Sequence, residues 1–282
     1  MREGGQEIDR VETDSPGHID FIPNRPGGKR RSIDAANMRI LYGPENQVKT
    51  FTAVNATTRT DSPPLKGKAQ PPAVTSSKGM AAHFNENTGV MDRLERWDSF
   101  EYREGEKQAK ADRADFLSAA EEIVLAGKAR VWDNTGATDA ARIILRQTTG
   151  EFEAVGNVSS TRLPDKKRDA KGGLISGDGA LQARGERMVS SDDNSRIVYE
   201  GKAILWQGPN RITADTLRID RGTNRLHATG NVMTQLLDKA ESKKGTAVFT
   251  VVRAPTLEYD DGNRLAHYKG GVNLKRGAMT VA

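Results

Sequence analysis

Histidines are the residues in this chain that could carry metal chemistry. The sequence contains four, His18, His83, His227 and His267, and no cysteine. Zinc sites are built from Cys, His and carboxylate ligands at short, regular spacings. His227 and His267 occupy equivalent positions of a repeat described below, but no further ligands accompany them at metal-binding spacing. We therefore expect no metal and no cofactor.

Acidic residues offer little more for catalysis. Asp112 and Asp215 also share a repeat position, but a catalytic pair needs environments that push its two pKa values apart. Exposed acids at the starts of strands explain them more simply. The glycine-rich stretch at 172–179 does not join a strand to a helix, as a phosphate-binding loop does. The tryptophans do not alternate with basic residues as in a single-strand nucleic-acid platform. We expect no catalytic residue, no enzyme and no nucleic-acid partner.

Composition favours an all-β chain with many turns. The 282 residues are 35% apolar, 29% charged and 5% aromatic, with 28 glycines and a net charge of +5. No stretch is long and apolar enough to span a membrane. The start, "MREGGQEIDRVETDSPG", lacks the apolar core of a secretion signal. Either the protein is cytoplasmic, or a signal or anchor is not included in this chain.

A repeated glycine organises the sequence. It recurs in "VLAGKARV", "EAVGNVSS", "VYEGKAIL", "HATGNVMT" and "HYKGGVNL". Glycine inside a strand marks a bulge, a bend or a close approach of another group. A small residue lies 16 positions before each one and is numbered position 0. The glycines that we expect to be structural are Gly127, Gly156, Gly201, Gly230 and Gly270, and their position 0 residues are Ala111, Ala140, Gly185, Ala214 and Ala254.

Apolar residues follow at fixed offsets, +3, +5, +12, +14 and +18. Steps of two within each half are the period of a β-strand and not of a helix. Turns such as "DRGTNR" and "YDDGNR" separate the halves. Each unit is therefore predicted to be two short strands joined by a tight turn, with polar, Lys-containing insertions at about 161–180 and 236–247. Only residues 104–127 suggest a helix, and the repeat predicts strand for their second half.

These motifs resemble the LptA/OstA family of lipopolysaccharide-transport proteins. The lines that carry the resemblance are "ITADTLRIDRGTNRLHATGNVMTQ" and "RAPTLEYDDGNRLAHYKGGVNLKRG", within residues 111–274. The resemblance implies an elongated, taco-like repeat β-jellyroll of two facing antiparallel sheets with an apolar slot between them. It also implies a Gram-negative periplasmic protein of outer-membrane biogenesis, like LptA, LptC or the N-terminal part of the outer-membrane translocon.

The residues expected to line such a slot are the apolar ones in phase with the repeat. They are Ile143, Leu145, Phe152, Val158, Ile197, Tyr199, Leu217, Ile219, Leu226, Val232, Leu257, Tyr259 and Val272. The slot would shield the acyl chains of lipopolysaccharide, since each methylene exposed to water costs about 0.8 kcal/mol. The same alternation would fill the dry core of a sandwich equally well.

Three functions stay open at this point. The first is a non-enzymatic lipopolysaccharide carrier, periplasmic or membrane-associated, that stacks head to tail through edge strands with other copies or transport components. The second is a polymerising β-solenoid scaffold that binds no lipid. The third is a carbohydrate-active enzyme on a parallel β-helix, which would need more acids on one face than Asp112 and Asp215 supply.

The chain is divided by composition as follows. Residues 1–30 are polar and could be disordered, and 31–60 form a weak first unit in which Phe51 stands where the glycine is due. A Pro-rich loop or linker follows at 61–77. Residues 78–282 form the main repeat region, although the register slips over 76–100.

Overall fold

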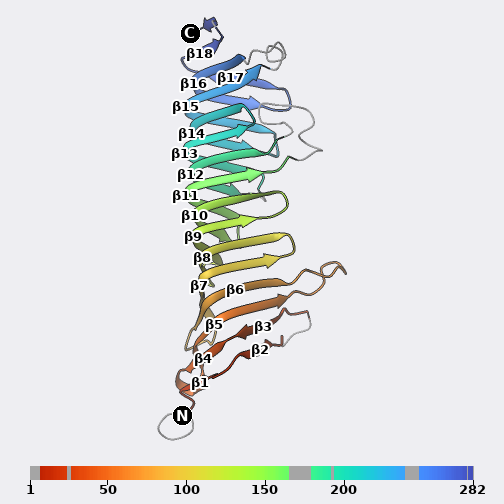
Figure 1. The fold of residues 1–282 in the computed structure, drawn as a ribbon, viewed down its shortest axis with the longest axis vertical. Coiled ribbons are helices and arrows are strands. Elements are labelled where there is room, and N and C mark those ends of the chain that lie inside the picture. Colours follow the sequence, from red (N-terminus) through yellow and green to blue (C-terminus); the bar gives the residue numbers. More distant parts are fainter. Residues whose placement is uncertain are drawn as a thin grey trace. The chain divides into compact units, whose positions relative to one another are not determined.

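The computed structural model of the chain describes residues 7–23, 27–164, 179–191, 194–238, 248–277 and 279–281. Its secondary structure is almost entirely antiparallel β-strand (Figure 1), and the helical turn in these residues is the short 3-10 segment η1, Pro44–Asn46. Residues 104–127 are in strands and turn, not helix. The all-β jellyroll prediction is confirmed. Most of the insertion at 161–180 and of that at 236–247 lies outside the described residues.

The chain divides into two compact units. Unit 1 comprises residues 1–134 and 142–148, and unit 2 comprises residues 135–141 and 149–282. The strands of unit 1 are β1 (Arg10–Glu12), β2 (Gly17–Phe21), β3 (Arg30–Ala35), β4 (Asn37–Tyr42), β5 (Val48–Asp61), β6 (Ala73–Phe84), β7 (Met91–Glu104), β8 (Lys107–Leu117) and β9 (Glu122–Trp132). Strand β10 (Gly136–Arg146) is divided between the units: its residues 136–141 belong to unit 2 and its residues 142–146 to unit 1.

Unit 2 continues with the same pattern of hairpins. Its further strands are β11 (Glu151–Arg162), β12 (Leu181–Ser191), β13 (Arg196–Gln207), β14 (Asn210–Asp220), β15 (Arg225–Asp238), β16 (Val248–Asp260), β17 (Leu265–Lys269), β18 (Asn273–Arg276) and β19 (Met279–Val281). Each of β11 to β16 pairs antiparallel with the next, and β17 and β18 both pair with β16. In unit 1, β5 to β9 pair in the same consecutive way.

Each long strand of the repeat bends once, near its middle. In β15 the bend is made by Gly230 and Asn231, whose φ angles are 75° and 48°, both left-handed. On β16, Thr256 pairs with Thr229 and Ala254 with Val232, so two residues on β15 oppose one on β16. This is a β-bulge, which bends a strand and increases its twist. The predicted pair of short strands is therefore the second half of β14 and the first half of β15, joined by the turn at 221–224, and each of the two strands continues beyond its bend.

Close packing explains why the first bulge residue is glycine. A Cβ on Gly230 would overlap the carboxylate of Asp215 on β14, and one on Gly201 would lie 2.8 Å from the Cβ of Glu186. The left-handed conformation itself also favours glycine. Asn231 tolerates it as well, and its side-chain amide donates a hydrogen bond to Asp215 (2.9 Å). Two requirements therefore favour glycine at the repeated position: the left-handed backbone of the bend and the close approach of a side chain from the neighbouring strand.

The same bulge exists in β7 without a glycine. Asp98 and Ser99 have φ angles of 59° and 63°. Trp97 pairs with Arg113 and Phe100 with Ala111, so these two residues again oppose one. The repeat therefore continues through 76–100, where the sequence register slipped. The slip came from using glycine as the marker of a bend that Asp and Ser also form here.

The bend turns both halves of a strand toward one interior. In β14 the buried side chains are Ile212 and Ala214 before the bend and Leu217 after it, with Ile219 half-buried. The step of three between Ala214 and Leu217 resets the alternation of faces. We call the strand halves that carry positions +3, +5, +12 and +14 wall A. The halves that carry positions −2, 0, +18 and +20 are wall B.

Segment boundaries differ from the sequence-based divisions at the N-terminal side. Residues 1–30 contain β1 and β2, because Ile19 of β2 packs against the core of unit 1 and β2 pairs with β3. The Pro-rich stretch 61–77 is a loop only up to residue 72, since β6 begins at Ala73. In the weak first unit the left-handed strand residue is Asn55 (φ 50°), not Phe51, which is buried.

Glycine at the bulge is expected to be required for stability. Gly230→Ala places a Cβ in a left-handed conformation and against Asp215. We expect a loss of about 2–4 kcal/mol in the free energy of unfolding, from backbone strain plus overpacking. Gly271→Ala is the control, since a Cβ there meets nothing within 4 Å. Urea unfolding measures both variants, and equal small losses would contradict this account of the bulge.

Candidate functional site

The candidate site is the interior enclosed by walls A and B, and its wall A rows are continuous in unit 2. Cross-strand pairing places Ile197 beside Ile219, Ile219 beside Leu226, and Leu226 beside Tyr259. A second row runs parallel to it through Tyr199, Leu217, Ala228, Leu257 and Tyr268. Directly opposed side chains of neighbouring strands contact one another. Each row is therefore an unbroken apolar band across β13 to β16, and Tyr268 of β17 extends the second row.

The thirteen residues expected to line a slot are mostly inside. Those that are buried are Ile143, Val158, Ile197, Tyr199, Leu217, Leu226, Val232, Leu257 and Tyr259. Leu145, Phe152 and Ile219 are half-buried. Val272 is exposed, because it follows the bulge of Gly270 outside any strand. Burial is what both a lipid slot and a dry core require, so the slot assignment stays a prediction.

Sequence reasoning missed most of wall B. In unit 2 it consists of a row in which Leu205 pairs with Ile212, Ile212 with Thr234, and Thr234 with Val252. All four side chains are buried. They occupy position −2 or +20, one alternation step beyond the offsets that we read. Continuing the period of two by one step beyond positions 0 and +18 would have found them.

The two walls touch across the interior. The hydroxyl groups of Thr234 on wall B and Tyr268 on wall A are 2.7 Å apart, and Thr234 is fully buried. Tyr199 on wall A forms a hydrogen bond with Ser160 on wall B. In unit 1, the rings of Phe100 and Phe116 meet edge to face with centroids 6.2 Å apart. These contacts close the interior in this structure.

The outer face carries ion pairs instead of apolar rows. Glu95 lies within salt-bridge distance of Arg93, Arg113 and His83, and Asp115 of Arg93 and Arg113. Bonds to the two arginines keep the pKa of Asp115 below its usual range against the effect of burial. Ion pairs at a protein surface contribute about 0–1 kcal/mol each. Here the two acids are partly covered and the arginines are exposed, and all of them lie on the face opposite the apolar rows.

The histidines and acids considered above as candidate metal-binding or catalytic residues do not form a cluster of metal ligands among the described residues. His227 and His267 flank Glu258 on neighbouring outer-face positions. His18 pairs with Asp34 and Asp20, and its pKa is raised by those hydrogen bonds. No group of three or more His, Asp or Glu in the described part of the chain could hold a metal ion. Asp112 lies against the bulge glycine Gly127 and Asp215 against Gly230, so packing at the bulge accounts for both acids.

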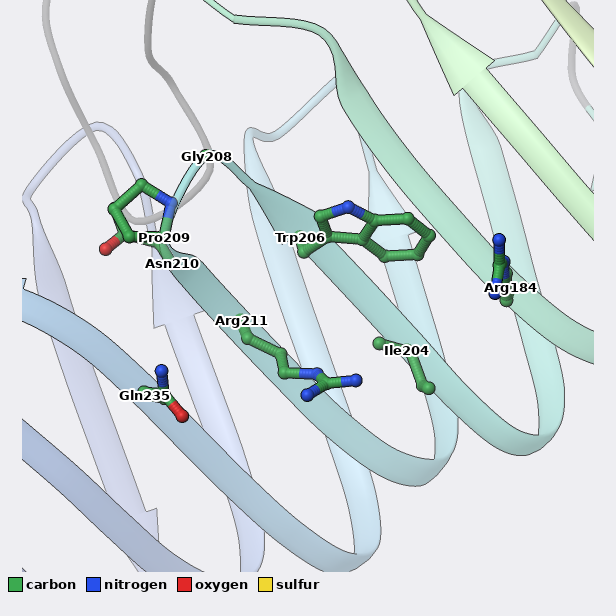
Figure 2. A pocket seen from close by; sticks show the side chains of 8 residues that line it. All are labelled: Arg184, Ile204, Trp206, Gly208, Pro209, Asn210, Arg211 and Gln235. Carbon is green, nitrogen blue, oxygen red and sulfur yellow. The ribbon is translucent and has the colours of Figure 1, made fainter.

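An outer pocket of about 230 Å³ lies beside Trp206 in unit 2. Its lining, shown in Figure 2, is Arg184, Ile204, Trp206, Gly208, Pro209, Asn210, Arg211 and Gln235. The guanidinium of Arg184 stacks over the Trp206 ring at 5.4 Å. Cations bind ring faces in this way, and the amide and guanidinium groups add hydrogen-bond donors. The pocket suits a polar or anionic group at the outer face.

A comparable pocket of about 430 Å³ occurs in unit 1, on the wall B halves of β6 to β9. It includes Trp132, over which Arg130 stacks at 5.6 Å, together with Lys110 and Arg103. Trp132 and Trp206 both stand 21 residues after their position 0. The repeat thus places the aromatic ring at the same register in both units, while the stacked cation comes from the same strand in unit 1 and from the neighbouring strand β12 in unit 2.

Comparisons with known proteins point to one family. Residues 73–151 match the family model described as LptA/(LptD N-terminal domain) LPS transport protein. The match includes β7, whose bulge lacks glycine. The crystal structure of LptH, the LptA homologous periplasmic component of the lipopolysaccharide transport device from Pseudomonas aeruginosa, is also similar. It has 16% identity and a TM-score of 0.38, over 44% of this chain and 82% of that chain.

No curated protein matches the chain in sequence. The resemblance to the LptA/OstA family that the repeated motifs indicated is nonetheless confirmed. No helix in the described ranges is both long and apolar enough to cross a membrane.

Buried tyrosines predict a stability loss at alkaline pH. Burial raises the pKa values of Tyr199 and Tyr268 above 10, their ordinary value. The unfolded chain therefore ionises first as pH rises, and the stability that the neutral hydroxyls contribute is lost above about pH 10. Thermal unfolding between pH 8 and pH 11.5 should show this decline. The decline should be shallower in Tyr199→Phe, and an identical profile would contradict the assignment.

Proposed function

We propose that this chain, whose residues 73–151 match the LptA and LptD N-terminal family of LPS transport proteins, takes part in lipopolysaccharide transport as a non-enzymatic carrier. Lipid acyl chains would lie between walls A and B. The observation that carries the proposal is the set of apolar rows that continue in register from strand to strand. The alternative is a dry core in a scaffold that binds no lipid.

The energetics support a lipid between the walls. Exposing an acyl chain of a dozen carbons to water costs roughly 10 kcal/mol at about 0.8 kcal/mol per methylene. The rows offer an apolar or aromatic side chain at each strand, so an acyl chain sliding along them meets an apolar surface throughout. Uniform binding avoids trapping the lipid at one point, which suits transport.

Opening the interior of unit 2 would break hydrogen bonds between the two walls. Between the walls, the Thr234–Tyr268 and Tyr199–Ser160 hydrogen bonds would have to separate. A hydrogen bond of this kind contributes about 0.5–1.5 kcal/mol to stability. The apolar side chains of each wall would then pack against acyl chains instead of against the other wall. A bound lipid could therefore part the walls at modest cost.

We propose the location and the partners from the resemblance to the LptA/OstA family, which residues 73–151 support. The resemblance implies a periplasmic protein, and we propose that compartment for this chain. Other transport components or copies of the chain would join through edge strands, whose free N–H and C=O groups favour pairing. β19, with all three residues exposed, is one such edge strand in the described residues.

Photo-crosslinking tests lipid binding between the walls. A photoreactive side chain at Ile219 or Leu145, both half-buried wall A positions, should label purified lipopolysaccharide. The control is Arg218, which neighbours Ile219 on β14 and is exposed on the opposite face. We expect labelling from the interior positions to exceed the control at least fivefold. Equal labelling from all three would favour the scaffold.

A further inference from the structure

A buried arginine interrupts the apolar interior of unit 1. Arg96 of β7 is only 1% exposed and is among the largest fully buried side chains. Its cross-strand partners are Met80 on β6 and Ala114 on β8, and Ala114 in turn pairs with Leu125. This row is the unit 1 counterpart of the wall A row that contains Leu217 in unit 2. Arg96 therefore stands where the repeat elsewhere places an apolar residue.

Most of the hydrogen-bonding capacity of Arg96 is unused. Its Nη2 donates to the sulfur of Met80 at 3.1 Å, a weak acceptor. Its Nε and Nη1 atoms are buried and have no hydrogen-bond partner in the part of the chain that the structure describes. Those two nitrogens carry three of the five N–H donors of a guanidinium. Buried donors of this kind normally have a partner.

The nearby acids do not compensate the charge. Glu95 lies on the outer face with Arg93, Arg113 and His83, and Asp115 with the same two arginines. Adjacent residues of a strand point to opposite faces, so Glu95 cannot turn toward Arg96. Burial alone lowers the pKa of Arg96 to about 10, which still leaves it cationic at neutral pH. The interior of unit 1 thus contains an uncompensated positive charge.

The surroundings restrict what could neutralise that charge. Met80 belongs to the apolar core of unit 1, together with Met38, Phe51 and Ala82. Across the bulge, Phe100 on wall B is 2% exposed. A small hydrated anion would have to enter this apolar space alone. An acid group attached to a hydrocarbon would bring its own apolar part, which the flanking rows can cover.

We propose that Arg96 binds the phosphate or carboxylate group of an anionic amphiphile whose hydrocarbon lies along the wall A rows of unit 1. The inference rests on the proposed lipid-carrying function and adds a specific recognition site to it. A buried cation without a partner is a poor core residue, because an apolar side chain of similar volume is usually neutral or stabilising there. An anion bound to Nε and Nη1 would satisfy donors that the protein leaves free.

Matched ligands separate the charge from the hydrocarbon. Isothermal titration calorimetry on the full chain would use decyl phosphate, decanol and inorganic phosphate as probes. The wild type should bind decyl phosphate at least tenfold more tightly than decanol. Arg96→Met should lower the affinity for decyl phosphate about 10- to 100-fold, the range for hydrogen bonds to charged groups. It should change the affinity for decanol by less than twofold. Arg96→Lys keeps the charge but has fewer hydrogen-bond donors, so its affinity for decyl phosphate should lie between those of the wild type and Arg96→Met.

The control variant removes a charge from the other face of the same strand. Arg93→Met should leave the affinity for all three probes within twofold, since Arg93 is exposed and ion-paired on the outer face. Thermal unfolding gives a second readout. Arg96→Met should raise the melting temperature of the ligand-free protein while reducing the rise that decyl phosphate causes. A purely structural arginine would show the opposite effect on the ligand-free protein.

The remaining outcomes of the titrations show whether the Arg96 site, the amphiphile or the lipid-carrying function is wrong. Equal losses for decyl phosphate and decanol in Arg96→Met, or no loss for either, would overturn the Arg96 site but not lipid binding. Inorganic phosphate binding as tightly as decyl phosphate would mean a free-anion site and overturn the amphiphile. If neither decyl probe binds the wild type, the proposed lipid function itself fails.

Discussion

A pair of left-handed residues in the middle of every second long strand, from β7 to β15, is the constraint on which the interior depends. A straight strand presents alternate side chains to two faces, so apolar residues could line only one surface of a flat sheet. The bulge at Gly230 and Asn231 bends β15 and resets the alternation. Both halves then face the same space. Because neighbouring strands bend at the same register, the bends stack, and two walls arise from one set of strands.

The division between inside and outside follows from that bend. Apolar side chains occupy the inward positions of both walls, while ion pairs such as those of Glu95 lie outside. The hydroxyl pair of Thr234 and Tyr268 shows how polar groups enter the interior, since each satisfies the other. Arg96 departs from this rule, because its Nε and Nη1 atoms lack partners among the described residues. The Thr234–Tyr268 pair is therefore part of a packed interior, whereas Arg96 has donors that a charged ligand could satisfy.

Particular residues show how far sequence reasoning reached. The glycine column and the alternation around Leu217 and Leu257 are local patterns, and they predicted strands, turns and buried faces. Asp98 and Ser99 form the same bulge without the expected residue types, so the pattern broke at β7. Most of wall B was missed because the period of two was not continued one step beyond positions 0 and +18, as Ile212 and Leu205 show.

The sequence by itself determined the strand period, the position of the bends marked by glycine and the identity of most inward side chains of wall A. These depend on neighbours along the chain, on backbone preference at Gly230 and on the period of two. Tertiary structure decided which inward groups meet, such as Tyr268 with Thr234, 34 residues away. It also decided that Arg96 has Met80 and Ala114 beside it and, among the residues that the structure describes, no hydrogen-bond partner at Nε or Nη1. Such contacts depend on strand register and on the closing of two walls, neither of which a local pattern encodes.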